Sequence, residues 1–241
     1  MKTLAVIQHT SAEFLGMIED HLEGRRIRFR YYRPFTAGGR LPTAEQCTDG
    51  LILLGGGPWG AVAGPRQLPR FEEEVALAQQ VLAADRPVIG IGLGALVLCR
   101  AVGGDVATAP LGFEVLTAHR SAADALAGFL PEQYPIVRYG CDEAVLPEHA
   151  RVLARDARGV AALFQVGKRA FGFAAHPGIK SAMIEDLIME FSEAPAEPGP
   201  GLLLLRSQQA ALEEALRFIM TGLVQCTDLM GPDAAASPAV R

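Results

Sequence analysis

The feature of this sequence that most restricts its fold is a run of glycines between an apolar segment and a helical one. Residues 87–92 read PVIGIG, and residues 93–104 continue as LGALVLCRAVGG. A buried strand, a glycine-rich turn and a helix in this order form a nucleophile elbow, in which a strained turn lifts one side chain out of a sheet. The tip of this elbow is Gly92, which has no side chain. The pattern therefore predicts the turn without its nucleophile.

The first part of the chain alternates strand-like and helix-like segments. Strands are predicted at residues 3–8, 27–33, 49–57 and 87–92, and helices at residues 13–22, 71–84 and 95–103. Strands that alternate with helices imply right-handed crossovers and a mostly parallel sheet that is covered on both faces. We therefore predict a three-layer, doubly wound α/β fold of the flavodoxin-like type.

After Gly104 the segments become shorter and are expected to form an antiparallel or mixed extension of the sheet. Strands are predicted at residues 113–118, 134–140, 151–156, 160–167 and 169–176, and a helix at 181–194. The predicted organisation is one domain over residues 1–193, a linker at 194–201, an amphipathic helix at 202–230 and a disordered tail at 231–241. The last helix is thus expected to be a C-terminal appendage.

Composition narrows the range of functions. The 241 residues are half hydrophobic and carry a formal charge of −5, with lysine and arginine scattered, so a nucleic-acid partner is not expected. No apolar segment approaches the roughly 20 residues that cross a bilayer, so we expect a cytoplasmic protein without a membrane partner. The four cysteines form no CxxC pair, and the sequence indicates no metal site and no cofactor.

Four stretches carry a resemblance to a known family. They are VIQHTSAE with GMIEDHL, then GRLPTAEQCTDGLILLGGGP, then RPVIGIGLGALVLCRAVGGDV, and finally LP at 146–147 followed by FGFAAHPG. In this order they resemble an opening strand and helix, an oxyanion loop ending Gly-Gly-Pro, the elbow G-I-C-L-G-x-Q and the strand that carries the histidine of H-P-E. The chain resembles the class I glutamine amidotransferases and their GMP-synthase-like relatives over about residues 1–180.

The resemblance implies a fold and a set of catalytic positions. In the family a cysteine thiolate attacks the glutamine amide, a histidine moves the proton and a glutamate orients the histidine. On this chain the nucleophile position is Gly92, the histidine is His176 and the acid position is Gly178. The resemblance therefore implies a degenerate triad from which only the histidine remains.

The expected substrate pocket also departs from the family. The resemblance places an oxyanion loop at Gly56, Gly57 and Pro58, and the backbone of Leu93 after the elbow. Leu96 and Ala174 stand where the family commonly has glutamines, so hydrogen-bonding partners for a polar amide are missing. Trp59 is expected to cover the pocket or to contact a partner.

Two cysteines are alternative nucleophiles. Cys99 lies about two helical turns beyond the elbow tip in an apolar segment, which favours a buried, unreactive thiol. Cys141 in YGCDE is placed by the resemblance in a loop near the site, but its acidic neighbours Asp142 and Glu143 would raise its pKa.

These observations predict a catalytically inactive amidotransferase-like protein. It would act as a structural or regulatory subunit of a synthetase or transferase, as a homo-oligomer, or as a small-ligand binding module. The alternative is an active glutamine amidotransferase or γ-glutamyl hydrolase that uses a displaced nucleophile.

Overall fold

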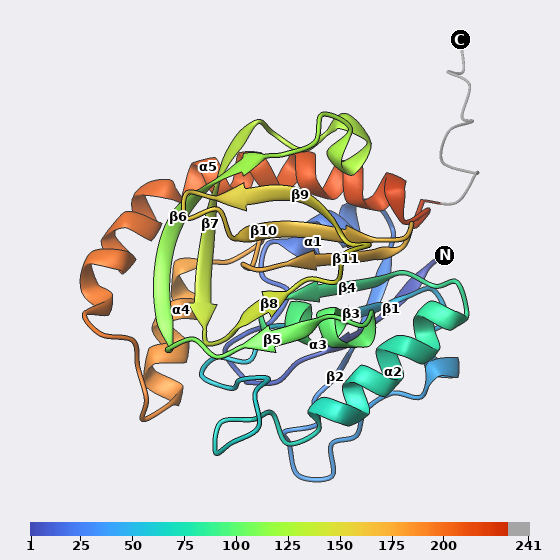
Figure 1. Ribbon diagram of the computed structural model, residues 1–241, viewed down its shortest axis with the longest axis horizontal. Helices are drawn as coiled ribbons and strands as arrows, with labels where there is room; N and C mark the ends of the chain where they lie inside the picture. Colours follow the sequence, from blue (N-terminus) through green and yellow to red (C-terminus); the bar gives the residue numbers. More distant parts are fainter. Residues whose placement is uncertain (231–241) are drawn as a thin grey trace.

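A sheet of nine strands runs through the protein, with helices on both of its faces (Figure 1). The computed structural model describes residues 1–230. The strand order is β2-β1-β3-β4-β11-β10-β9-β6-β7. This arrangement confirms the predicted α/β fold.

One half of the sheet is parallel. Its strands, in spatial order, are β2 (Arg28–Tyr32), β1 (Thr3–Ile7), β3 (Leu51–Leu53), β4 (Val88–Ile91) and β11 (Ala170–Phe173). Every neighbouring pair among them is parallel. The carboxyl ends of β3, β4 and β11 therefore meet at one edge, which brings together three loops that are far apart in the sequence.

The other half of the sheet is antiparallel, and β11 joins the two halves as predicted. Its strands are β10 (Ala161–Val166), β9 (Arg151–Asp156), β6 (Gly112–Arg120) and β7 (Gln133–Gly140). A separate two-stranded sheet, β5 (Asp105–Ala107) with β8 (Glu143–Val145), was not predicted. Both of its strands have only three residues, too few for a periodic pattern.

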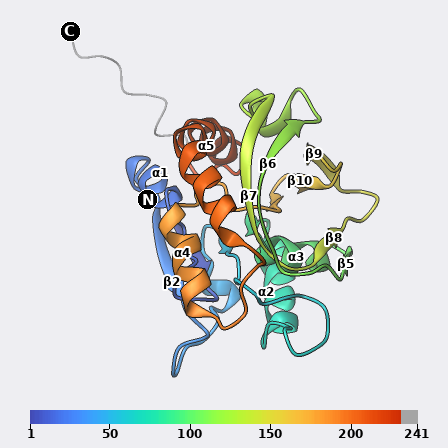
Figure 2. The ribbon, with the colours of Figure 1, turned by 90° about the vertical axis from the view of Figure 1, so that its left-hand side faces the viewer.

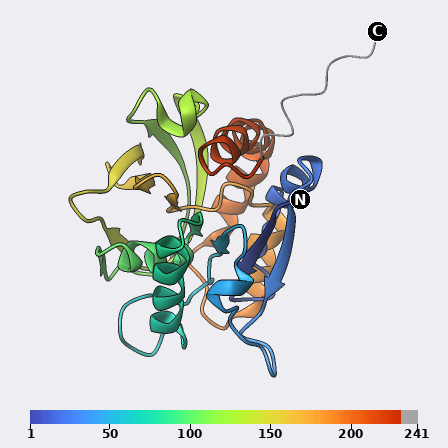
Figure 3. The ribbon, with the colours of Figure 1, turned by 90° about the vertical axis from the view of Figure 1, so that its right-hand side faces the viewer.

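Two helical layers enclose the sheet. On one face lie α1 (Ile18–Gly24), α4 (Ser181–Glu190) and α5 (Pro198–Cys226), and on the other α2 (Phe71–Ala83) and α3 (Leu93–Ala101). Figures 2 and 3 show the two groups on opposite sides of the strands. Each face has its own cluster of buried apolar side chains. Short 3-10 turns occur at η1 (Ala44–Gln46) and η2 (Ala125–Gly128).

The last helix begins earlier than expected and belongs to the α4 face. It starts at Pro198, so the final four residues of the expected linker form its first turn, where proline is favoured. Leu205, Leu212 and Leu216 are buried by their contacts with the core. The predicted tail at 231–241 lies outside the described residues.

The first helix begins later than expected. Helical spacing predicted a start at residue 13, but α1 begins at Ile18 because Gly16 adopts φ +60°, which interrupts a helix. Residues 13–17 instead form a loop whose first side chain, Glu13, is buried.

None of the helices within residues 1–230 combines the length and the apolar composition that a membrane-spanning helix needs.

Candidate functional site

The predicted elbow is present between β4 and α3. Gly92 has φ +56° and ψ −118°, a backbone conformation that residues with a Cβ rarely adopt. The turn sits close against the sheet: a Cβ on Gly94 would lie 2.1 Å from the carbonyl oxygen of Leu53. Glycine at these positions therefore allows α3 to begin directly at the strand ends.

His176 follows β11 and is held by the backbone through both ring nitrogens. Its Nε2 lies 2.7 Å from the carbonyl oxygen of Phe14, and its Nδ1 lies 3.1 Å from the amide nitrogen of Gly178. A carbonyl only accepts and an amide N–H only donates, so the ring is neutral with its proton on Nε2. Burial lowers the pKa of His176 to about 4. This imidazole has no free lone pair with which to accept a proton.

Gly178 contributes backbone to the same region. Its carbonyl oxygen accepts the amide of Met17, and a Cβ at this position would lie 2.7 Å from Cγ1 of Ile18 and 3.0 Å from its amide nitrogen. The close packing of this turn on α1 leaves no room for an acidic side chain.

Glu13 is the side chain nearest to the elbow tip, and no sequence pattern singled it out. It is 3% exposed, and its Oε2 accepts the amide N–H of Gly57 at 3.0 Å. Burial raises the pKa of Glu13 to about 7, against the lowering effects of the Gly57 amide and of His9. The N–H of the predicted oxyanion loop is thus already bonded to a carboxyl group of the protein.

A buried pair lies behind this carboxyl group. His9, directly after β1, is within 2.9 Å of Glu74 through Nε2 and within 3.0 Å of the Gly55 carbonyl oxygen through Nδ1. Burial by itself lowers the pKa of His9, but the charge and hydrogen bond of Glu74 raise it above its ordinary value. Both ring nitrogens of His9 face an acceptor, the Gly55 carbonyl oxygen and the Glu74 carboxylate, so both can donate only when the ring is protonated. The contacts therefore fit an imidazolium beside a carboxylate.

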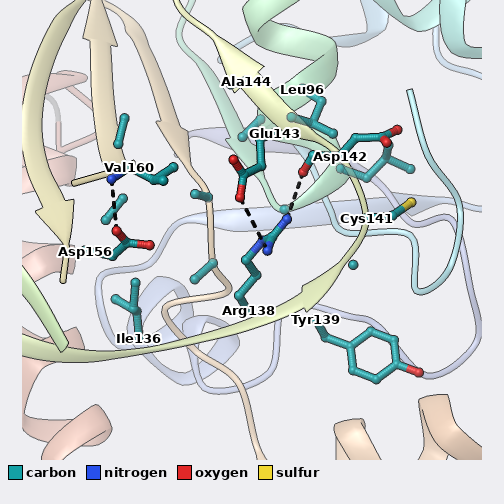
Figure 4. Close-up of a pocket in the computed structure, with 18 of the residues that line it drawn as sticks. Leu96, Ile136, Arg138, Tyr139, Cys141, Asp142, Glu143, Ala144, Asp156 and Val160 are labelled. Carbon is teal, nitrogen blue, oxygen red and sulfur yellow. Dashed lines mark hydrogen bonds and ion pairs between the residues drawn. The ribbon is translucent and has the colours of Figure 1, made fainter. Parts of the chain in front are cut away.

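Residues of the elbow and of the glycine loop line one cavity. Figure 4 shows this cavity, with Arg138, Glu143 and Leu96 among the labelled lining residues. Of the residues predicted for this site, the lining includes Gly56, Gly57, Trp59, Gly92, Leu93, Leu96 and Ala174. Pro58, His176 and Gly178 are not part of the lining. The cavity volume is about 50 Å³, far below the roughly 300–1,000 Å³ of pockets that take drug-sized ligands.

A closed ring of four charged side chains lies beside the cavity, and three of the four, Arg138, Glu143 and Arg158, line it. Arg138 of β7 lies 3.3 Å from Glu114 of β6 and 3.6 Å from Glu143 of β8. Arg158, after β9, lies 3.4 Å from the same oxygen of Glu114 and 3.6 Å from the same oxygen of Glu143. We call these four residues the ion-pair ring. Asp156 adds a further carboxylate on Arg158 at 3.0 Å. None of the four residues of the ring was singled out for this role from the sequence.

The two candidate cysteines are both buried. Cys141 lines the cavity, and its Sγ lies 3.5 Å from the carbonyl oxygen of Pro58. Burial and then Asp142 raise the pKa of Cys141, and burial raises that of Cys99 to about 11. Both thiols are therefore protonated at neutral pH. Within residues 1–230 no group of three metal-ligating side chains is found.

The comparisons with known proteins agree with this geometry. The family model of "Glutamine amidotransferase class-I" matches residues 13–190. The chain belongs to the class I glutamine amidotransferase family. That match spans the glycine loop, the elbow and the His176 turn.

Individual relatives share this fold. The chain is 31% identical over 168 residues to "GMP synthase [glutamine-hydrolyzing]" of Aeropyrum pernix, which covers 66% of this chain and 31% of the relative. The chain thus spans about a third of that relative's length. The structure of a glutamine amidotransferase from Methylobacillus flagellatus superposes with TM-score 0.79 and 22% sequence identity. The match covers 94% of this chain and 96% of the Methylobacillus chain. A Thermoplasma acidophilum protein described as a GMP synthase subunit superposes with TM-score 0.58 and 16% sequence identity. That match covers 87% of this chain and 98% of the Thermoplasma chain. The likeness to these two structures shows the fold alone.

Proposed function

We propose that this protein is a non-catalytic member of the class I glutamine amidotransferase family. The observation that carries the proposal is the state of His176, whose two ring nitrogens are both bonded to backbone, together with the glycine at the elbow tip, Gly92. Acyl transfer needs a nucleophile and a base within hydrogen-bonding reach of each other. Neither requirement is met by these residues.

Two further contacts support the proposal. The amide of Gly57 donates to Glu13 at 3.0 Å, so it is not free to stabilise a tetrahedral oxyanion. Leu96 and Ala174 line the cavity where the family resemblance predicts amide-binding glutamines, and the cavity is small. Neither of these two side chains can hydrogen-bond to a glutamine amide.

The role that remains is structural or regulatory, within a larger enzyme. The Aeropyrum relative is a GMP synthase about three times as long as the matched region, and the Thermoplasma relative is described as one component of such an enzyme. By analogy, this chain would dock on a synthetase or transferase partner. Its four free cysteines fit a reducing compartment such as the cytoplasm.

The deciding experiment incubates the purified protein with glutamine and, separately, with a glutamine-derived chloroketone. We expect no glutamate above the protein-free rate and no added mass on any cysteine. An active class I amidotransferase treated in parallel serves as the positive control. Glutamate release, or a covalent adduct, would refute the proposal.

An active enzyme with a displaced nucleophile is the second candidate, favoured by the presence of Cys141 in the cavity wall. Its protonated thiol, bonded to the carbonyl of Pro58, argues against this reading. If glutamate release were detected, its loss in Cys141→Ala and its retention in Cys99→Ala would identify Cys141 as the nucleophile.

A further inference from the structure

The strand at one end of the nine-stranded sheet has an open edge. β2 is the first strand in the spatial order and pairs with β1, and within residues 1–230 no strand lies beyond it. The amide N–H of Arg28 and the carbonyl oxygen of Tyr32 form hydrogen bonds on the β1 side. Because the direction of the backbone groups alternates along a strand, the N–H and C=O groups of Phe29 and Tyr31 point away from β1. We call this side of β2 the open edge.

The open edge is rich in arginine. Six arginines lie in and around β2, at positions 25, 26, 28, 30, 33 and 40, and residues 24–44 contain no aspartate or glutamate. Arg25 and Arg33 form side-chain hydrogen bonds to Thr221 and Gln8. The other four side chains are exposed and have no hydrogen bond or ion pair within residues 1–230. An acidic protein, with a formal charge of −5, thus carries a cluster of unpaired positive charges at one end of its sheet.

The side chains of β2 differ between the two faces of the sheet, since successive residues of a strand point to opposite faces. Arg28 and Arg30 are exposed on one face, where Tyr32 packs against the apolar cluster of the α2 side. Phe29 and Tyr31 lie on the other face, half-buried against the apolar cluster of the α1 side. Their rings meet edge to face with centroids 5.7 Å apart. The open edge therefore offers positive charge on one face and aromatic surface on the other.

A polypeptide strand fits this edge better than a nucleic acid does. Its N–H and C=O groups can bond in register to the free groups of Phe29 and Tyr31, whereas a phosphate backbone supplies acceptors without donors. A second copy of β2 would place arginine opposite arginine, and like charges directly opposite each other destabilise a sheet. The fitting partner is therefore a strand of opposite charge.

We propose that the open edge of β2 binds an extended segment of a partner protein in which acidic and apolar residues alternate. The segment adds to the sheet as an antiparallel strand, which is the more stable pairing per residue. Its acidic side chains lie opposite Arg28 and Arg30, and its apolar side chains lie opposite Phe29 and Tyr31. The proposal locates a contact with the partner that the proposed function requires, and it rests on that function in this respect alone. Glutamine turnover tests catalysis and strand binding tests the open edge, so the two can fail separately.

The experiment measures fluorescence anisotropy of a short labelled peptide with the full-length protein, at neutral pH and low ionic strength. The peptide has capped ends and alternates glutamate with valine. One control peptide has the same composition with its glutamates contiguous. Another has N-methylated valines, which removes the donors that face β2 in the antiparallel pairing. We expect the alternating peptide to bind at least tenfold more tightly than either control.

Variants of the protein test the charges. Arg28→Glu combined with Arg30→Glu should weaken binding of the glutamate peptide at least tenfold and should bind an alternating lysine–valine peptide instead. This exchange of preference keeps the test decisive, because an unfolded variant would bind neither peptide specifically. Arg206→Glu combined with Arg217→Glu makes the same change in net charge at side chains 55% and 64% exposed on α5, and should leave binding unchanged.

Several results would overturn the proposal. Equal binding of the contiguous or the N-methylated peptide would show charge attraction without strand pairing. Tighter binding of a single-stranded oligonucleotide of the same net charge would assign the arginines to a nucleic acid. No binding of the alternating peptide would mean that the arginines only prevent pairing between sheet edges.

Discussion

The elbow and the ion-pair ring both contribute residues to the lining of one cavity, and they are built in different ways. The elbow depends on backbone: glycines at 90, 92 and 94 let α3 start against the ends of β3 and β4. The ion-pair ring depends on side chains from three strands and a turn, which no backbone rule requires. The geometry of the elbow therefore depends on where glycine stands in the sequence, whereas the ring depends on the identity of four side chains.

This difference shows where a fold and its chemistry separate. A glycine turn is kept because the helix and the sheet cannot approach otherwise, whether or not a nucleophile stands on it. The side chains around the turn are not fixed by this backbone requirement. Variants in the two regions should therefore change stability for different reasons. Substitutions in the elbow should act through steric overlap, and substitutions in the ion-pair ring should act through the loss of charge pairs.

The largest effect is expected at Gly94. In Gly94→Ala the new Cβ would lie 2.1 Å from the carbonyl oxygen of Leu53, which is backbone and cannot rotate away. We expect a loss of about 3 kcal/mol in the free energy of unfolding, measured by urea denaturation. Gly24→Ala is the matched control because its Cβ would have no neighbour within 4 Å. It should change stability by less than about 1 kcal/mol. Similar losses in both variants would contradict a steric role for Gly94.

The next effect concerns Glu13 and depends on pH. Its pKa is raised from 4.5 to about 7 in the folded protein, mainly by burial, with Glu190 raising it and His9 lowering it. The folded state therefore holds this proton more tightly than the unfolded state does. The resulting stability is fully present below pH 4.5 and is lost as the pH rises through about 7. Glu13→Gln removes this dependence and keeps an acceptor for the Gly57 amide.

The measurement compares the unfolding free energies of wild type and Glu13→Gln between about pH 4.5 and 8. The variant should gain up to about 3 kcal/mol relative to wild type across this range. His176 contributes an opposite slope, because its pKa is lowered from 6.5 to about 4 and its stabilisation is lost as the pH falls through that interval. His9, whose pKa is raised, loses its contribution at higher pH. The slope of His176 cancels in the difference, because Glu13 is not among the causes of its shift. Glu13 contributes to the raised pKa of His9, but it is the smallest of the causes, after Glu74 and Gly55, so most of the His9 slope cancels as well. A difference that is constant with pH would show that Glu13 is not a buried acid.

A smaller effect is expected in the ion-pair ring. The side chain of Arg138 is 13% exposed and that of Arg158 is 39% exposed. Arg138→Met leaves Glu114 and Glu143 without their most buried partner and should cost about 1–2 kcal/mol. Arg158→Met should cost less than about 1 kcal/mol, and only that loss should be abolished by about 1 M NaCl. Equally small losses of stability in Arg138→Met and Arg158→Met would indicate that all four charges of the ring are exposed to solvent.

The parts of the structure that follow from short-range patterns could be predicted from the sequence. The parallel strands that precede the elbow and the turn at Gly92 follow from apolar runs and glycine spacing. The state of His176 could not be predicted, because its partner Phe14 is 162 residues away. Glu13 was missed because helical spacing placed it in a helix, whereas Gly16 turns that segment into a loop. The ion-pair ring joins four separate segments, none of which carries a pattern for it.

The smallest expected effect is on glutamate release when a thiol is placed at the elbow tip. In Gly92→Cys the new Cβ would lie 3.8 Å from Oε1 of Glu13, and a neighbouring carboxylate raises the pKa of a thiol. The lone pair of His176 would remain on the amide of Gly178, and the amide of Gly57 would remain on Glu13. We therefore expect no glutamate release from glutamine, and alkylation by iodoacetamide no faster than that of free cysteine. Gly92→Cys combined with Glu13→Gln should speed alkylation, since the carboxylate is gone, but should still release no glutamate. Turnover by the single variant would mean that a thiol on the backbone of the elbow is enough for catalysis, and that the contacts of His176 and Glu13 do not prevent it.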